Sequence, residues 1–194
     1  VFFSYEESAE AILIKAFNTW LGRQLSNNNR RALRAYFKSG DVNLLTGHIS
    51  SNELQAAERE FFSTYVDTGR LRIHYTDYSA PTLTDAMRYL QRNAPLGGVF
   101  VDYMQLLRQG GGRFGSRQEE LKQVCLDLKD AAVQTGLPLV IAAQFNRQVI
   151  DEAHLSPVYI GEAGDIERIA NLIIGFWNRN FAGFSPEGNR TKDG

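Results

Sequence analysis

Glu6, Asp102 and Gln144 each follow a short apolar run, a position in which a side chain can carry chemistry. A carboxylate such as Glu6 can take a proton from a water molecule as a general base. A carboxylate such as Asp102, at the tip of a buried strand, can hold Mg²⁺ through water beside a nucleotide. An amide such as Gln144 can sense a phosphate group. Taken together, these residue types suit a site that binds a nucleotide.

Each of the three positions also has an ordinary structural explanation. Residues 4–7, Ser-Tyr-Glu-Glu, fit a capping box, and acidic side chains favour a helix N-terminus. Asp102 can equally cap a helix or a turn. Gln144 taken alone is better explained by a hydrogen bond to loop backbone. The residues by themselves therefore leave the functional and structural interpretations open.

The elements that must position these residues are alternating strands and helices. Near-continuous apolar strands that alternate with helices predict an α/β fold with a mostly parallel sheet covered on both faces. In such sheets ligands gather at the carboxyl ends of the strands, where all three residues stand. Apolar spacing predicts helices over residues 8–21, 28–38, 51–66, 82–93 (just after Pro81) and 116–135, and strands within 1–3, 71–75, 98–107 and 137–145, followed by a short helix and a last apolar strand within 165–179.

Length and charge narrow the class of protein. A chain of 194 residues with net charge −1 suits one globular domain, and any nucleic-acid site would have to be local. The single cysteine, Cys125, excludes an internal disulfide and favours a reducing compartment such as the cytoplasm. His48, His74 and His154 lie far apart, which argues against a histidine metal site. No apolar run approaches the roughly 20 residues of a membrane span.

Several local strings resemble motifs of DnaB-type replicative DNA helicases, whose motor domain is RecA-like. The string "FFSYEES" resembles their S-L-E-M stretch, and "VFVDYMQLL" resembles their I-D-Y-L-Q-L strand. The string "PLVIAAQFNR" is similar to P-V-x-x-L-S-Q-L-N-R, and "GEAGDIERIAN" to R-E-S-G-x-I-E-Q-D-A-D. The resemblance covers nearly the whole chain and is tightest from Gly98 to Arg179.

This resemblance implies a P-loop NTPase fold and assigns roles to the three residues. Glu6 would be the catalytic glutamate that orients water, and Asp102 the aspartate that binds Mg²⁺ through water. Gln144 would couple the γ-phosphate of ATP to loops that face DNA. The intact parent would be an ATP-dependent helicase that forms a hexameric ring, translocates on single-stranded DNA, and has a primase or helicase loader as a possible partner.

The same resemblance suggests which residues contact DNA. Two loops, residues 108–117 and 147–157, would face the centre of the ring, and we expect segments 109–115 and 148–156 to be the most mobile internal ones. A solvated, flexible loop is an equally good interpretation of the first segment without the resemblance. The expected DNA-contacting residues are Arg108, Arg113, Arg117, Arg147, Glu162 and Gly164.

Some positions depart from the family pattern. Gly161 stands in place of an arginine, Ala143 in place of a serine, and Arg168, Ile169 and Asn171 interrupt the acidic Q-D-A-D run. These departures indicate a divergent branch, such as one from a phage or a mobile element.

One motif of the family is absent from the sequence. The string G-x-x-x-x-G-K followed by Ser or Thr does not occur, and "NRTKDG" near the end does not match the family's Lys-x-Arg. We therefore expect residues 1–179 to be a truncated motor domain that lacks the phosphate-loop strand and is inactive alone, and residues 180–194 a flexible tail. Two alternatives are a non-catalytic RecA-like module that binds DNA or protein, and a RadA- or KaiC-like ATPase.

Overall fold

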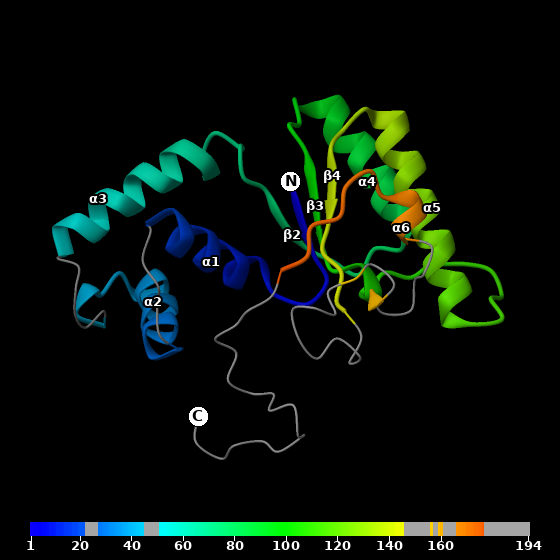
Figure 1. Ribbon diagram of the computed structural model, residues 1–194. Helices are drawn as coiled ribbons and strands as arrows, with labels where there is room; N and C mark the ends of the chain where they lie inside the picture. The colour runs from blue at the N-terminus through cyan, green and yellow to red at the C-terminus, as the bar shows by residue number, and fades with distance from the viewer. Residues whose placement is uncertain (22–26, 45–50, 146–155, 157–158, 161–165, 177–194) are drawn as a thin grey trace, which may run out of the picture. The chain divides into compact units, whose positions relative to one another are not determined.

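The computed structural model describes residues 1–21, 27–44, 51–145, 156, 159–160 and 166–176 (Figure 1). None of the helices in these segments is long and apolar enough to cross a membrane. The strands are β1 (Phe2–Ser4), β2 (Ile73–Tyr75), β3 (Val99–Asp102) and β4 (Leu139–Ile141). The helical elements are α1 (Ala9–Leu21), α2 (Asn27–Ser39), η1 (Val42–Leu44), α3 (Ser51–Phe61), the π-helical η2 (Phe62–Val66), α4 (Ala80–Asn93), η3 (Met104–Leu106), α5 (Arg117–Thr135) and α6 (Ile166–Ile169).

The strands form one sheet in the order β2-β1-β3-β4. β1 pairs in parallel with both β2 and β3, so that Phe3 lies opposite His74 and Val101. Ser4 lies opposite Asp102, which aligns the carboxyl ends of β1 and β3. The predicted α/β class with a parallel sheet is thereby confirmed.

The chain divides into two compact units. The first comprises Val1–Thr76 with Val99–Asp102, and the second comprises Asp77–Gly98 with the described residues from Tyr103 onward. The first unit contains β1, β2, β3 and α1 to α3, and the second contains α4, α5, β4 and α6.

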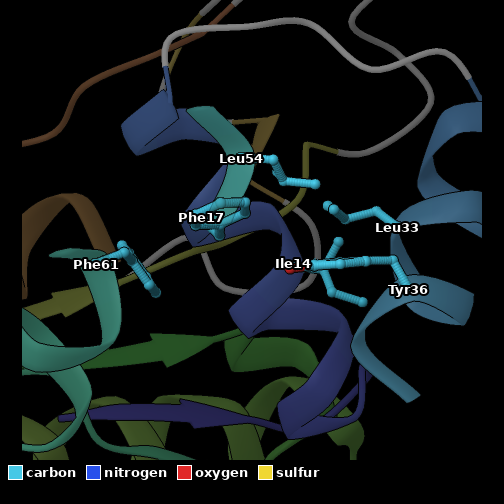
Figure 2. Packing of buried hydrophobic residues seen from close by; sticks show 6 residues of the cluster. All are labelled: Ile14, Phe17, Leu33, Tyr36, Leu54 and Phe61. Atoms are coloured by element: carbon cyan, nitrogen blue, oxygen red, sulfur yellow. The ribbon is translucent and has the colours of Figure 1, made fainter. Parts of the chain in front are cut away.

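The core of the first unit lies among α1, α2 and α3 (Figure 2). Phe17 is fully buried, and its ring meets those of Phe37 and Phe61 edge-on, with centroids 5.7 and 5.3 Å apart. Truncating such a ring to alanine costs about 3–5 kcal/mol. The buried members of this core are Ile14, Phe17, Leu33, Tyr36, Leu54 and Phe61, and their helical spacing agrees with the predicted helices.

Capping residues explain where the main helices of the second unit begin and end. The Ser116 hydroxyl accepts the N–H of Glu119 at the start of α5, and Gly136 ends α5 with a positive φ of 65°. Ser79 caps α4, so Pro81 lies in the first turn of that helix rather than before it.

The apolar residues of the sequence 116–135 recur at helical spacing, which predicts one buried stripe on this helix, and the stripe is buried in α5. Leu121, Val124, Cys125 and Leu128 are each at most 6% exposed. Leu121 and Cys125 pack with Met104, and Ile141 of β4 joins this cluster. The periodicity of residues 116–135 therefore identified the buried face of the helix correctly.

The prediction of a last apolar strand is wrong for residues 171–176. This segment follows α6 and is neither helix nor strand in the structure. Leu172, Ile174 and Phe176 are strongly exposed, at 76%, 65% and 84%. A strand needs a hydrogen-bonded neighbour as well as apolar residues, and no described residue pairs with this segment.

Cys125 should react slowly in the native chain. Its thiol lies 3.3 Å from the Met104 sulfur and is buried, which disfavours the reactive thiolate. We expect a maleimide to label Cys125 only after unfolding in urea. A Cys125→Ser, Gln118→Cys variant, with its thiol at an exposed position of α5, should label at once in the native state. Rapid native labelling of Cys125 would contradict its burial.

His74 should make the chain less stable in acid. Burial lowers the pKa of His74, and the positive charges of the amino terminus and Arg72 lower it further, while its ring stacks on Phe3 with centroids 5.3 Å apart. A histidine whose pKa is lowered in the folded chain favours the neutral form. Its contribution to folding stability is therefore complete above its pKa in the unfolded chain, about 6.5, and is lost as the pH falls below that pKa.

The measurement is the urea midpoint of unfolding at about pH 7.5 and about pH 5, on either side of that unfolded pKa. We expect His74→Phe to lose less stability than the wild type between these conditions. An equal loss in both proteins would assign the acid sensitivity to other groups.

Candidate functional site

The carboxyl ends of β1 and β3 bring three carboxylates into one region of the first unit. The N–H of Tyr5 donates to the carbonyl of Asp102 over 2.8 Å, which continues the pairing of β1 and β3 beyond Ser4. On the other side of β1, the N–H of Thr76 donates to the carbonyl of Ser4 over 2.9 Å. Glu6 and Glu7 therefore leave the sheet at the point where Asp102 ends β3.

A buried serine shapes the turn that carries Glu6 and Glu7. Ser4 is fully buried, and its hydroxyl accepts the N–H of Glu7 over 3.0 Å. The helix that follows is capped separately, because the hydroxyl of Ser8 accepts the N–H of Ala11 over 3.2 Å. Of the two hydrogen bonds of a capping box, only the one accepted by the serine hydroxyl forms here. The Glu7 carboxylate forms an ion pair with Lys15 instead.

Glu7 is the carboxylate whose charge acts on Asp102. Burial raises the pKa of Asp102, the negative charge of Glu7 raises it further, and Lys15 opposes both. Glu7 is partly buried and forms an ion pair with Lys15, whereas Glu6 is exposed. From the sequence, Glu7 was interpreted only as part of a possible capping box, and Lys15 was not considered. The available signal was a lysine in the second turn of the helix that directly follows two adjacent glutamates.

The arrangement fits a hard divalent cation that is held mainly through water. Carboxylate oxygens are the ligands that Mg²⁺ prefers, and it usually retains several waters. Among the described residues, no group of three or more His, Cys, Asp or Glu side chains is placed to hold a metal directly. The water-mediated contact of Asp102 with Mg²⁺ that the resemblance implies stays a prediction.

Gln144 lies in the second unit, where another glutamine holds its backbone. The N–H of Gln144 donates to the side-chain oxygen of Gln105 over 3.2 Å. The side-chain nitrogen of Gln105 donates to the carbonyl of Gln144 over 2.9 Å. Glu6 and Asp102 belong to the first unit, so their convergence with Gln144 stays a prediction.

The glycine-rich loop, residues 108–117, is closed at its base by Glu120. The Glu120 carboxylate accepts hydrogen bonds from the backbone N–H of Gln109 at 3.0 Å, from Arg108 at 3.3 Å, and from Arg117. Burial alone would raise the pKa of Glu120, but the hydrogen bonds from Gln109 and Arg117 lower it on balance. The carboxylate is therefore held ionised between the two ends of the loop.

The three arginines of this loop have different surroundings. Arg117 donates to the carbonyls of Gln105 and Leu107 over 2.8 and 2.7 Å, so its guanidinium is engaged within the protein. The Arg108 side chain is 66% exposed and shares Glu120 with Arg117. Arg113 is exposed and has no ion pair with a described residue. Contact of all three with DNA stays a prediction, and Arg113 is the most accessible candidate.

The loop is anchored at further points along its length. The carbonyl of Arg108 accepts the N–H of Ala80 over 2.8 Å, and the N–H of Gly115 donates to Glu119 over 2.8 Å. The mobility predicted for residues 109–115 is not tested by these contacts. Arg147, Glu162 and Gly164 lie outside the described residues, as does almost all of the second predicted loop.

Two solved structures share the fold of this chain. The ATPase domain of G40P superposes with a TM-score of 0.61 at 21% identity, covering 87% of this chain and 56% of that one. A structure titled as a DnaB-like replicative helicase and its interactions with primase gives a TM-score of 0.57 at 20% identity, covering 87% of this chain and 38% of that one. The RecA-like fold implied by the resemblance is confirmed.

Relatives in sequence are replicative helicases. A probable plasmid replicative DNA helicase of Chlamydia muridarum is 28% identical over 138 residues, which are 70% of this chain and 30% of that protein. The replicative DNA helicase DnaC of Bacillus subtilis is 30% identical over 88 residues, which are 44% of this chain and 19% of that protein. The chain thus spans less than a third of the length of these relatives.

The model of one protein family covers almost the entire sequence. It is described as the DnaB-like helicase C-terminal domain, and it matches residues 2–190. The chain therefore belongs to the DnaB-like helicase C-terminal domain family.

Proposed function

We propose that this chain is part of the motor of a replicative DNA helicase that hydrolyses ATP with Mg²⁺ and translocates on single-stranded DNA. The observation that supports the proposal is the backbone pairing at the aligned ends of β1 and β3, where the turn that carries Glu6 and Glu7 begins opposite Asp102. In open α/β sheets this edge is where ligands bind. Membership of the helicase family supports a nucleotide as the ligand.

The residues have distinct roles in this proposal. Glu6 is exposed on the turn after β1 and orients or deprotonates the attacking water. Asp102 would hold Mg²⁺ through water, and the metal would neutralise charge on the phosphates. Gln144, which follows β4, senses the γ-phosphate of ATP. Glu7 and Lys15 adjust the charge around Asp102.

DNA and partner proteins complete the proposal. Arg113 and Arg108 contact the phosphates of single-stranded DNA from the glycine-rich loop. Further proposed contacts come from Arg147 in the second predicted loop and from Glu162 and Gly164, which follow that loop in the sequence. The working form is a homo-hexameric ring in the cytoplasm. A helicase of the same fold is described with primase, and we extend a primase or loader partner to this protein as part of the proposal.

Substituting Glu6 tests the catalytic assignment. In the full-length protein that the gene encodes, Glu6→Gln should lower the rate of ATP hydrolysis by about 10²–10⁴-fold, the usual contribution of a general base. Glu10→Gln is the matched control, because Glu10 is an exposed glutamate in the first turn of α1. A phosphate-release assay measures both variants. Equal rates for Glu6→Gln and Glu10→Gln would remove Glu6 from the mechanism.

The 194-residue chain by itself should not turn over ATP. Phosphoryl transfer depends on fixed positions for the phosphates, and the sequence contains no Gly-Lys-Ser/Thr loop to hold them. The same assay on the purified chain should show only background phosphate release. Steady turnover that Glu6→Gln abolishes would reveal a phosphate site elsewhere in the chain.

Arg113→Ala should weaken binding to single-stranded DNA. A lost phosphate contact should lower affinity for an oligo-dT in a sequence-independent way and reduce the slope of log K against log salt by about one. Fluorescence anisotropy of a labelled oligonucleotide over a salt series measures both quantities. Arg92→Ala is the control, since Arg92 is exposed on α4. A similar loss in both variants would indicate only non-specific charge attraction.

A further inference from the structure

Gln105 makes a two-point contact with the backbone that follows β4. Its side-chain nitrogen donates to the carbonyl of Gln144 and its side-chain oxygen accepts the N–H of Gln144, over 2.9 and 3.2 Å. One residue earlier, the N–H of Met104 donates to the carbonyl of Ala142 over 3.0 Å. Because a planar amide satisfies both partners only in one orientation, Gln144 cannot shift without breaking this contact or moving Gln105 with it.

The backbone of Gln105 is in turn bound by the arginine at the base of the glycine-rich loop. Arg117 donates to the carbonyl of Gln105 over 2.8 Å and to the carbonyl of Leu107 over 2.7 Å. A second nitrogen of the same guanidinium donates to Glu120. The rigid fork of an arginine therefore ties the segment that carries Gln105 to the first turn of α5.

Glu120 extends this connection to the start of the loop. Its carboxylate accepts the N–H of Gln109 over 3.0 Å as well as the guanidinium of Arg117. The side chains of Arg117 and Glu120 are only 22% and 16% exposed, so water and salt weaken this pair less than a surface pair. Both ends of the loop thus depend on the Arg117–Glu120 pair, which is bound directly to Gln105.

From these contacts we propose that Gln105 is a positioning residue through which a displacement of Gln144 reaches the glycine-rich loop, by way of Arg117 and Glu120. The inference rests on the proposed function in one respect, namely that Gln144 responds to nucleotide and that the loop contacts DNA. Two-point contacts in series cannot absorb a shift by rotation of one side chain. A shift at one end either moves the other end as well, or it breaks one of the contacts, which gives two discrete arrangements.

Amide hydrogen exchange of the wild-type chain and its variants tests the connection without any ligand. Gln105→Leu removes both side-chain hydrogen bonds and replaces the amide with an apolar side chain of similar size. We expect it to accelerate exchange at the N–H groups of Gln109 and Gly115 by roughly three- to tenfold, the effect of one net hydrogen bond. Arg117→Lys, which loses the fork but keeps the charge, should act in the reverse direction and accelerate exchange at Gln144.

The matched control is Gln91→Leu. Gln91 also donates its side-chain amide to a backbone carbonyl, that of Thr135, over 2.6 Å in the same unit. This control should leave exchange at Gln109, Gly115 and Gln144 unchanged. The N–H of Ala94, which donates to Leu90 at the end of α4, reports any general loosening.

Several outcomes would overturn the proposal. They are acceleration in Gln105→Leu that is confined to Gln144, equal acceleration at Ala94, and no effect of Arg117→Lys on Gln144. The first would show that Gln105 holds only its direct neighbour. The second would show a general structural role, and the third would show that the connection does not run through Arg117.

A second arm adds saturating oligo-dT. In the wild type, occupancy of the loop should change exchange at the Gln144 N–H, and in Gln105→Leu this response should be lost. A response that survives unchanged in Gln105→Leu would also overturn the proposal. If the wild type does not bind the oligonucleotide, the DNA part of the proposed function fails, while exchange in the free chain still decides whether Gln105 connects the two segments.

Discussion

The pairing of β1 with both β2 and β3 is the constraint on which the candidate site depends. Parallel pairing aligns the carboxyl ends of these strands, which puts Ser4, Tyr75 and Asp102 at one level. A slip of β1 by one residue would turn buried Phe3 toward the other face and move the turn that carries Glu6 and Glu7. The position of this turn relative to Asp102 therefore depends on the register of the strands.

Patterns that are local in the sequence predicted the framework, and contacts between distant side chains were missed. Helical period located α5 and its buried stripe, and apolar runs located β1 and β3 with Asp102 at the end of β3. The pair of Glu7 with Lys15 and the contact of Gln105 with Gln144 depend on side-chain direction, which no period encodes. At residues 171–176 a strand was predicted that does not form. Apolar residues favour a strand only where a neighbouring strand can pair with them.

Glu120 reduces the positive charge that the glycine-rich loop offers, in a chain whose net charge is −1. One carboxylate engages a backbone N–H and two guanidinium groups at the base of the glycine-rich loop. Arg117 therefore binds groups within the protein, whereas Arg113 is exposed. Counting arginines in this loop overstates the charge that a polyanion would meet, and their hydrogen bonds give the better measure.

The glycines of this loop differ sharply in what they would tolerate. Gly110 has a φ of +76°, and a Cβ there would lie 2.5 Å from the Cβ of Ser79, so a larger residue would force the loop away from the start of α4. At Gly111 a Cβ would meet nothing within 4 Å. A fluorescent label could therefore be attached through a cysteine at position 111 without disturbing the loop. Among natural variants, position 110 should almost always be glycine.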